Sequence, residues 1–440
     1  MGRAATERDP LRHVKSSVRA LAAYTLASRE APIKLNQNEN PWDLPEPVKR
    51  RILERALARP WSRYPDFDPH DLLEALARFS GWHSDGILAG NGSNEMIEAL
   101  LLVTVSEGTR VVIPEPTFTL YALMTTILGG EPVRVRLLPP PGPVAPAGGR
   151  DGALRSLPMV SRCPAEGPTV EVTASRHPRG TGPAQSLAPG DPARTLAVEG
   201  PPAGSPGLRY DVEALLEARR ASGATLTIVC SPNNPTGTSL SAADVERLCD
   251  DSDSLVVIDE AYHEFAGASV VPLLERHPNL VVLRTFSKAM ALAGLRVGYL
   301  LASPELVREV NKARLPYNVN FFSQAAALAA LEEPEVLALS VRRLVRERER
   351  LLARLADVPG VRAWPSSANF FLLELPSADP KAVFASLLRR GVLVRDVSSY
   401  PTLSRCLRVS VGSEPENEAF LHALGSALGE AGVDLSLGRA

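Results

Sequence analysis

The stretch Arg284-Thr-Phe-Ser-Lys288-Ala-Met-Ala-Leu-Ala-Gly294-Leu-Arg296-Val-Gly298 places a lysine just beyond the end of a predicted strand. The apolar run 280–283 precedes it and the run 297–302 overlaps its end, and both have the composition of buried strands. Lysine is scarce in this chain, because arginine supplies nearly all of the other positive charge. Arginine stays protonated, whereas a desolvated lysine can lose its proton and attack a carbonyl. Lys288 is therefore a candidate reactive amine, with an ordinary surface lysine as the alternative.

Further predicted strands alternate with helices on either side of this stretch. The runs 225–230 and 255–259 have the composition of buried strands, and segments of helical spacing separate them. This alternation predicts an α/β fold with a mostly parallel sheet and helices on both faces. In such sheets, ligands bind beyond the carboxyl ends of the strands. Asn234, Asp259 and Lys288 each end or follow a predicted strand, so we expect them to share one pocket.

The chain is expected to divide into an arm and two domains. Residues 1–45 would form an N-terminal arm, residues 46–315 a large domain, and residues 316–440 a smaller α+β domain. Within the large domain, the segment 139–207 is dominated by Pro, Gly, Ala, Ser and Arg and has no apolar periodicity. Such a segment buries too little apolar surface to offset its ordering entropy. We therefore predict an insertion without stable order in a surface connection, which loop-closure entropy tolerates.

The composition argues against several functional classes. The net charge is -2 and no block of basic residues occurs, so nucleic acids and anionic membranes are not expected partners. No run of about 18 apolar residues is present, so no transmembrane helix is expected. The four cysteines are far apart and form no CxxC pair, which argues against a zinc site or a disulfide framework. These features, with no apolar signal segment at the N-terminus, predict a cytoplasmic protein without a metal site.

Two features indicate that the pocket binds anions. The run Gly90-Asn-Gly92-Ser93-Asn94-Glu95 opens a predicted helix, where free backbone N–H groups and the helix dipole attract phosphate. It lacks the third glycine of a dinucleotide-binding motif, and a plain helix cap is the alternative. Arg408 lies inside an otherwise apolar strand, where a charge is costly unless it meets an anion. It would bind either a ligand anion or a structural carboxylate.

Together these residues suit pyridoxal 5'-phosphate. The chain has no GxSxG motif of a hydrolase and no GxxxxGK[ST] motif of a nucleotide-binding loop. Lys288 would bind the cofactor covalently, and Asp259 would pair with the protonated pyridine nitrogen. Asn234 and Tyr262 would hydrogen-bond the ring oxygen, and Phe118 would cover one face of the ring. The cofactor phosphate would be held by Thr285, Ser287, Arg296 and the N–H groups of Ser93 and Asn94.

Three motifs resemble those of fold-type I aminotransferases of classes I and II. They are Ser231-Pro-Asn-Asn-Pro-Thr-Gly237, Asp259-Glu-Ala-Tyr262, and Ser287-Lys288 followed by Gly294-Leu-Arg-Val-Gly298. Within this superfamily the sequence is most similar to the histidinol-phosphate aminotransferase family. That similarity rests on the stretches 35–41, 63–66, 92–95, 116–118, 394–396 and 407–412. The insertion at 139–207 is not part of the family pattern, and a badly placed insertion could obstruct dimerisation.

The resemblance implies further roles and a reaction. Lys288 would also move a proton between the substrate carbon and the cofactor carbon, and Tyr64 would reach the cofactor phosphate of a neighbouring subunit in a homodimer. Substrate binding would fall to Tyr24, Asn40, Arg395 and Arg408. The reaction would be reversible amino transfer from histidinol phosphate to 2-oxoglutarate, giving imidazole-acetol phosphate and glutamate in histidine biosynthesis.

Other enzymes of the same fold remain open as alternatives. A threonine-phosphate decarboxylase or an aromatic amino-acid aminotransferase would share the cofactor residues. Arg395 and Arg408 favour a phosphorylated amine as substrate but do not separate histidinol phosphate from threonine phosphate. A catalytically inactive or regulatory protein that binds pyridoxal phosphate is a further alternative.

Overall fold

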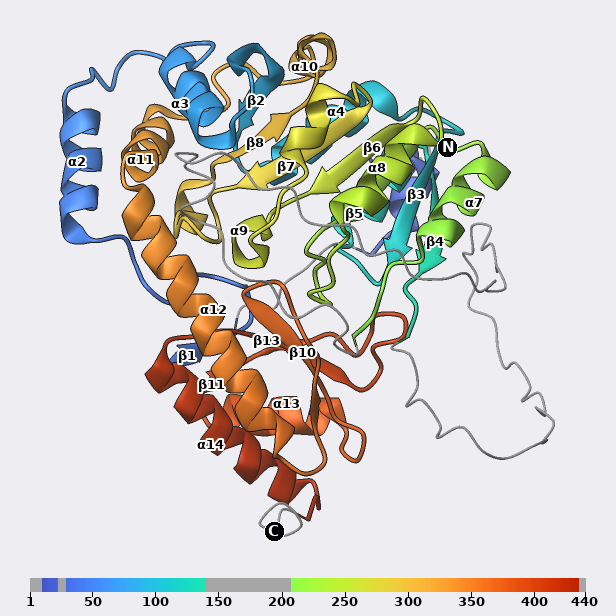
Figure 1. Cartoon of the computed structure of the whole chain (residues 1–440), viewed down its shortest axis with the longest axis vertical. Coiled ribbons are helices and arrows are strands. Elements are labelled where there is room, and N and C mark those ends of the chain that lie inside the picture. The colour runs from blue at the N-terminus through green and yellow to red at the C-terminus, as the bar shows by residue number, and fades with distance from the viewer. Residues whose placement is uncertain (1–9, 23–28, 140–206, 435–440) are drawn as a thin grey trace, which may run out of the picture.

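The computed structural model describes residues 10–22, 29–139 and 207–434 (Figure 1). The predicted insertion, apart from its two end positions, and the predicted substrate residue Tyr24 lie outside the described residues. Within the described ranges, no helix has the length and apolar character needed to cross a membrane. In the same ranges, no group of three or more His, Cys, Asp or Glu residues is placed to hold a metal ion.

A seven-stranded sheet forms the centre of the larger unit, with strand order β2-β8-β7-β6-β5-β3-β4 (Figure 1). Neighbouring strands are parallel except at β8, which runs antiparallel to both β2 and β7. The predicted α/β fold with a mostly parallel sheet is thus confirmed, with one reversed strand that the sequence did not reveal. The strands are β2 (Ile87–Gly90), β3 (Arg110–Glu115), β4 (Glu131–Arg136), β5 (Leu226–Cys230), β6 (Leu255–Asp259), β7 (Leu280–Thr285) and β8 (Gly298–Leu301).

Helices cover both faces of this sheet. Consecutive strand residues point to opposite faces, so Ile228 joins one apolar cluster and Val229 the other. Because both faces are covered, β5 is buried at every position and its sequence is continuously apolar rather than alternating. The first cluster contains residues of α4 (Ser93–Thr104), α5 (Leu120–Leu128) and α10 (Pro304–Asn311). The second contains residues of α2 (Glu46–Leu57), α3 (His70–Ser80), α7 (Val212–Ser222), α8 (Ala242–Asp250) and α11 (Phe321–Leu331).

The smaller unit is built on an antiparallel sheet of four strands, with order β12-β13-β10-β9. A further two-stranded parallel sheet joins β1 from the N-terminal region to β11. The segment 392–395 is therefore divided between two sheets, because its first two residues pair with β1 and Arg395 pairs with β13. The elements are β1 (Ile33–Lys34), α12 (Pro334–Ala356), β9 (Arg362–Ala363), β10 (Phe370–Glu374), α13 (Pro380–Arg389), β11 (Val392–Leu393), β12 (Arg395–Asp396), β13 (Cys406–Ser410) and α14 (Glu414–Glu430).

The contacts of two elements bear on how the chain divides into units. Helix α11 packs against α2 and α3, which belong to the larger unit, although the sequence predicted the smaller domain to begin at residue 316. Strand β1 belongs to the predicted N-terminal arm but pairs with β11 in the smaller unit. The long helix α12 then runs from the larger unit along the smaller one (Figure 1).

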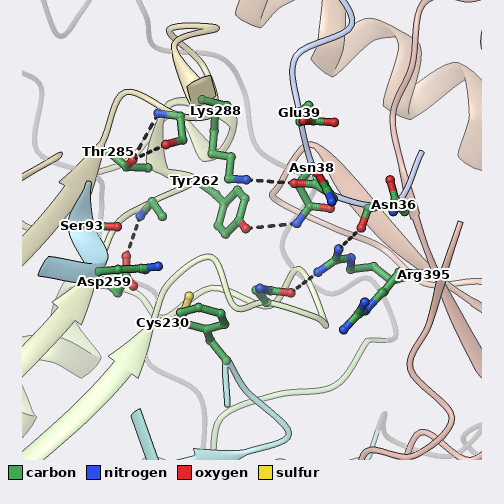
Figure 2. A pocket seen from close by; sticks show the side chains of 18 of the residues that line it. Asn36, Asn38, Glu39, Ser93, Cys230, Asp259, Tyr262, Thr285, Lys288 and Arg395 are labelled. Carbon is green, nitrogen blue, oxygen red and sulfur yellow. Dashed lines mark hydrogen bonds between the residues drawn. The ribbon is translucent and has the colours of Figure 1, made fainter. Parts of the chain in front are cut away.

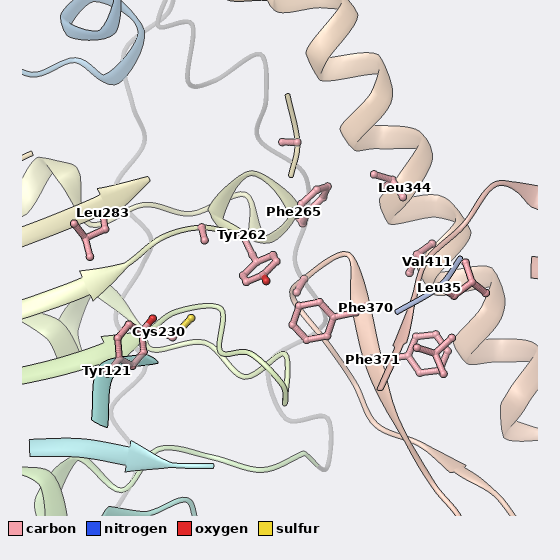
Figure 3. Packing of buried hydrophobic residues seen from close by; sticks show 14 of the residues in the cluster. Leu35, Tyr121, Cys230, Tyr262, Phe265, Leu283, Leu344, Phe370, Phe371 and Val411 are labelled. Carbon is pink, nitrogen blue, oxygen red and sulfur yellow. The ribbon is translucent and has the colours of Figure 1, made fainter. Parts of the chain in front are cut away.

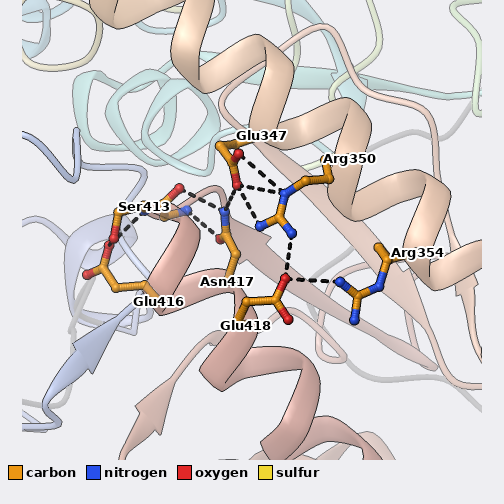
Figure 4. Close-up of polar contacts among 8 residues, drawn as sticks. Glu347, Arg350, Arg354, Ser413, Glu416, Asn417 and Glu418 are labelled. Carbon is orange, nitrogen blue, oxygen red and sulfur yellow. Dashed lines mark hydrogen bonds and ion pairs between the residues drawn. The ribbon is translucent and has the colours of Figure 1, made fainter.

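A polar network ties α14 to α12 close to the end of β13 (Figure 4). Arg350 forms an ion pair with Glu347 at 2.8 Å and with Glu418 at 2.5 Å. The amide of Asn417 donates to Glu347 Oε2 at 3.0 Å and accepts from the backbone N–H of Gly412 at 2.9 Å. Ser413 and Glu416 form a capping box at the start of α14. These contacts hold the turn that follows β13, the strand that carries Arg408.

One apolar cluster continues from the central sheet into the smaller unit (Figure 3). Tyr121 and Leu283 lie at its sheet end, and Phe371 and Val411 lie in the smaller unit. Tyr262 lies between these groups and packs edge-to-face on Phe370, with ring centroids 5.1 Å apart. The side chains between the two units are therefore positioned by a shared core.

Candidate active site

A cavity of about 440 Å³ lies beyond the carboxyl ends of β5, β6 and β7 (Figure 2). Its volume is within the usual range for small-molecule sites. Asn234, Asp259 and Lys288 all line it, so the structure brings together the three residues that were predicted to share a pocket. Arg395 and Arg408 of the smaller unit line it as well. The pocket is therefore shared between the two units of the chain.

Asp259 ends β6 and is almost fully buried, with 3% of its surface exposed. Its Oδ2 accepts the hydroxyl of Tyr121 at 2.6 Å, and its Oδ1 accepts the backbone N–H of Ala261 at 3.0 Å. Burial raises the pKa of Asp259 to about 6, against the opposing effect of these two hydrogen bonds. The carboxylate is thus held in one orientation in a setting of low polarity, where its charge interacts strongly with a cationic partner.

Lys288 lies in the loop after β7, with its amine directed across the cavity (Figure 2). Nζ donates a hydrogen bond to the backbone oxygen of Gln37 at 3.0 Å. Burial lowers the pKa of Lys288 to about 8, with a further lowering from Arg408 that Glu39 partly opposes. The neutral amine is therefore far more populated near pH 8 than in an ordinary lysine. This side chain can both donate and accept a proton near neutral pH.

Two asparagines lie next to groups that were predicted to act in the site. Asn234 Oδ1 accepts a hydrogen bond from Arg408 Nη1 at 2.5 Å. Asn38 Nδ2 donates to the phenol oxygen of Tyr262 at 3.1 Å (Figure 2). Tyr262 is buried, and burial raises the pKa of its phenol, so it stays protonated over the physiological range.

Arg395 and Arg408 form a cationic wall on the side of the pocket that the smaller unit supplies. They are direct cross-strand partners in the pairing of β12 with β13. Arg408 also donates from Nη2 to the backbone oxygen of Asn36 at 2.6 Å and lies over the ring of Phe370. Like charges directly opposite each other in a sheet are unfavourable. An anion bound between the two guanidinium groups would relieve that repulsion and receive charge-assisted hydrogen bonds.

A second group of donors gathers where β8 meets the start of α4. Thr285 Oγ1 donates to Ser287 Oγ at 3.0 Å, and Arg296 Nη1 donates to the same oxygen at 3.2 Å. Ser93 and Asn94, in the first turn of α4, line the pocket as well, and a Cβ at Gly92 just before them would lie 2.5 Å from Arg296 Nη2. Free N–H groups at the N-terminus of this helix add to the attraction for an anion. The arrangement fits a phosphate group.

Residues 30–145 and 198–424 match the family described as aminotransferase class I and II. The chain belongs to the class I and II aminotransferases. It is 33% identical to the histidinol-phosphate aminotransferase of Chlorobium phaeovibrioides over 420 residues, which cover 95% of this chain and 98% of the relative. It is 34% identical to the enzyme of the same name from Desulfitobacterium hafniense, over 94% of this chain and 97% of the relative.

Solved structures of a histidinol-phosphate aminotransferase and of a threonine-phosphate decarboxylase have the same fold as this chain. The histidinol-phosphate aminotransferase of Sinorhizobium meliloti in complex with pyridoxal-5'-phosphate has a TM-score of 0.73 at 23% identity and covers 95% of this chain and 98% of its own. The L-threonine-O-3-phosphate decarboxylase of Porphyromonas gingivalis has a TM-score of 0.66 at 20% identity and covers 90% of this chain and 99% of its own. At these identities the likeness concerns the fold alone.

Some predicted site residues of the aminotransferase lie in the pocket, and others do not. Phe118 lines it, with its ring edge-on to Tyr121 at 5.5 Å between centroids. Asn40 is not among the described residues that line it; its amide donates to Ser340 Oγ on α12 at 2.9 Å and to the backbone oxygen of Ala289 at 3.3 Å. Tyr64 lies on the surface with 80% of its area exposed. The roles assigned to these residues stay predictions.

Sequence reasoning missed two residues that hold the site together. Tyr121 binds Asp259, and Asn38 binds Tyr262. A signal for Tyr121 was present, because a phenol in an apolar helix needs a hydrogen-bond partner when it is buried. Asn38 lies in the polar run 35–41, and of its asparagines only Asn40 was singled out. Nothing in the local sequence of that run distinguishes Asn38 from Asn40.

Replacing Gly298 with alanine is expected to disrupt the phosphate side of the site. A Cβ at this position would lie 2.1 Å from the backbone nitrogen of Ser93 and 2.5 Å from the backbone carbon of Gly92. Because both are main-chain atoms, α4 would have to move away from β8. We expect a loss of stability of about 1–3 kcal/mol, the usual cost of overpacking, together with weaker cofactor retention.

Thermal unfolding and a cofactor-binding titration would measure both effects. Gly425→Ala is a matched control, because Gly425 lies within α14 with open space around its Cβ position. Alanine there is expected to stabilise the helix by up to about 1 kcal/mol. A Gly298→Ala protein with unchanged melting temperature and cofactor affinity would contradict the prediction.

Proposed function

We propose that this aminotransferase uses pyridoxal 5'-phosphate to transfer an amino group between histidinol phosphate and 2-oxoglutarate. The observation that carries the proposal is the arrangement of the pocket. A partly buried amine with a lowered pKa, a buried carboxylate and a pair of arginines from the smaller unit all line it. The names of the relatives support the choice of histidinol phosphate.

The residues present fit pyridoxal phosphate at three separate points. Thr285, Ser287 and Arg296, with the first turn of α4, offer donors for its phosphate. Asp259, which Tyr121 orients, offers a carboxylate for its pyridine nitrogen. Phe118 lines the same pocket and offers an aromatic face for the ring. When bound, pyridoxal phosphate supplies an electron sink that makes the substrate carbon–hydrogen bond acidic.

The chain's own side chains supply proton transfer and orientation. Lys288 Nζ, with its pKa near 8, would accept the proton from the substrate carbon and deliver it to the cofactor carbon. Tyr262 and Asn234 would donate to the ring oxygen. Tyr262 is buried and Lys288 is partly buried, so both are shielded from bulk water, which strengthens each of these interactions.

The cationic wall would bind the anionic end of each substrate in turn. The phosphate of histidinol phosphate and a carboxylate of 2-oxoglutarate both accept paired hydrogen bonds from a guanidinium group. Arg395 and Arg408 are cross-strand neighbours, so both can reach the same anion. This feature favours a phosphorylated amine over an aromatic amino acid. The arginine pair would bind threonine phosphate equally well, so a threonine-phosphate decarboxylase remains the second candidate.

The proposal includes a homodimer in the cytoplasm. Tyr64 stacks on Tyr317 with ring centroids 4.5 Å apart, and both are exposed. Trp61 and Phe67 are exposed large aromatic residues of the same segment, and such patches mark interaction surfaces. A partner subunit covering this patch would bring Tyr64 to the neighbouring site. Free buried thiols at Cys230, Cys249 and Cys406 support a reducing compartment.

Product analysis of the purified holoenzyme would test the proposal. Histidinol phosphate with 2-oxoglutarate should give glutamate at a rate far above that with phenylalanine as the donor. Threonine phosphate alone should release no carbon dioxide. Release of carbon dioxide without glutamate would identify the decarboxylase instead, and equal rates with phenylalanine would point to the aromatic enzyme.

A further inference from the structure

Asn38 occupies an unusual position for a residue that was not predicted to act in the site. It is buried, with 1% of its surface exposed, and its backbone is left-handed, with φ of 55°. A non-glycine residue in this region is held there by its surroundings, at some cost in free energy. Such positions cluster at functional sites, and Asn38 borders the pocket beside Tyr262 (Figure 2).

Asn38 makes four hydrogen bonds. Its backbone N–H donates to Ser410 Oγ at 2.9 Å, and its backbone oxygen accepts from Asn369 Nδ2 at 3.1 Å. Its side-chain Oδ1 accepts the hydroxyl of Ser410 at 2.9 Å. Its side-chain Nδ2 donates to the phenol oxygen of Tyr262 at 3.1 Å. Every polar group of this residue therefore has a partner.

The structure places the NH₂ end of the amide toward the phenol and its oxygen toward Ser410. Ser410 Oγ already accepts from the backbone N–H of Asn38, so its single hydrogen is available for Oδ1. With Oδ1 turned toward Ser410, the NH₂ group is turned toward Tyr262. A phenol has one hydrogen, and here its oxygen receives the amide hydrogen. The hydrogen of Tyr262 is then free to point at an acceptor inside the pocket.

We propose that Asn38 is a positioning residue that directs the hydroxyl hydrogen of Tyr262 into the pocket, toward the ring oxygen of the cofactor. This inference rests on the proposed function, because the acceptor is part of pyridoxal phosphate. Tyr262 cannot turn its ring away easily, since Phe370 packs edge-on against it at 5.1 Å. Burial also raises the pKa of its phenol, so the hydrogen is retained.

The same bonds connect the phenol to the strand that binds the substrate anion. Ser410 lies two residues after Arg408 in β13, so both side chains are on one face of that strand. Tyr262 comes from the loop after β6 in the larger unit. Asn38 thus joins the cofactor side of the pocket to its substrate side through two side-chain hydrogen bonds.

Asn38→Asp tests the direction of the hydrogen, because a carboxylate of the same shape only accepts hydrogen bonds. Tyr262 would then donate to residue 38 instead of to the ring oxygen. A hydrogen bond to a charged group shifts the pKa of that group by roughly one unit or more. Losing the bond from Tyr262 should therefore raise the pH at which the visible band of the bound cofactor titrates by about one unit. With the amine donor, kcat should fall about 10–100-fold, the range for residues that orient a functional group, while KM changes little.

Measuring the same substitution in a Tyr262→Phe protein separates this effect from the added charge. The shift that remains without the phenol measures the charge alone, and the difference between the two backgrounds measures the effect through Tyr262. A difference near one unit supports the proposal, and equal shifts overturn it. Asn311→Asp at the end of α10 adds the same charge at a residue that does not line the pocket, and it should leave the band unchanged.

Ser410→Ala provides a test that adds no charge, should Asn38→Asp fail to fold. It removes the hydroxyl that holds Oδ1, and we expect a smaller shift in the same direction that disappears in the Tyr262→Phe background. A shift of equal size in both backgrounds overturns the role of Asn38.

The spectral titration needs no substrate, so these results do not depend on which amine is used. A wild-type protein without any cofactor band would overturn the proposed function as well, which distinguishes the two failures.

Discussion

Replacing Lys288 with alanine is expected to abolish amino transfer. The substitution removes both the group that would bind the cofactor covalently and the base that would move the substrate proton. A positioned acid–base residue contributes up to about 10⁴-fold to a rate, so we expect a loss of at least about that size. Lys288 is one of six lysines in the chain, and its amine points into the pocket.

Borohydride reduction followed by mass spectrometry would identify the attachment site. In the wild type the reduced cofactor should be found on the peptide that contains Lys288, and capture by the apoprotein should speed up as the pH rises through about 8, where the amine loses its proton. Lys312→Ala is a suitable control, because Lys312 lies at the surface beyond α10 in an ion pair with Glu309. A Lys288→Ala protein that transaminates at the normal rate would refute the assignment.

Replacing Asp259 with asparagine is expected to give the second largest loss. The amide keeps the size of the side chain and can still accept the hydroxyl of Tyr121, so the fold should be retained. It cannot carry the negative charge that would pair with the pyridine nitrogen. Removal of one preorganised electrostatic partner typically costs about 10²–10³-fold in kcat. We expect a loss in that range.

The pH dependence of cofactor binding gives an independent measure of the Asp259 prediction. The carboxyl group has a pKa of about 6, so it becomes neutral as the pH falls through that value. Wild-type affinity for the cofactor should therefore fall between pH 7 and pH 5, whereas this decrease should be missing in Asp259→Asn. The exposed Asp253 offers a control, since Asp253→Asn should leave both activity and pH dependence unchanged. Full activity in the Asp259→Asn protein would contradict the pairing of Asp259 with the pyridine nitrogen.

The local signals in the chain were sufficient for most of the central sheet. Strands β5 and β6 are short apolar runs bounded by turn residues, and burial on both faces produces such runs. The reversed direction of β8 was not visible, because an apolar run has the same composition in either direction. The split between β11 and β12 was also hidden, since it depends on which partner each residue finds.

By itself the sequence determined that Asn234, Asp259 and Lys288 would meet, because the carboxyl ends of neighbouring parallel strands lie at one edge of a sheet. It also carried the motifs that assign the chain to its family. Only the tertiary structure decided that Tyr121 orients Asp259 and that Asn38, rather than Asn40, contacts Tyr262. These contacts join residues far apart in the chain, and their geometry follows from the packing of whole elements, which no local pattern records.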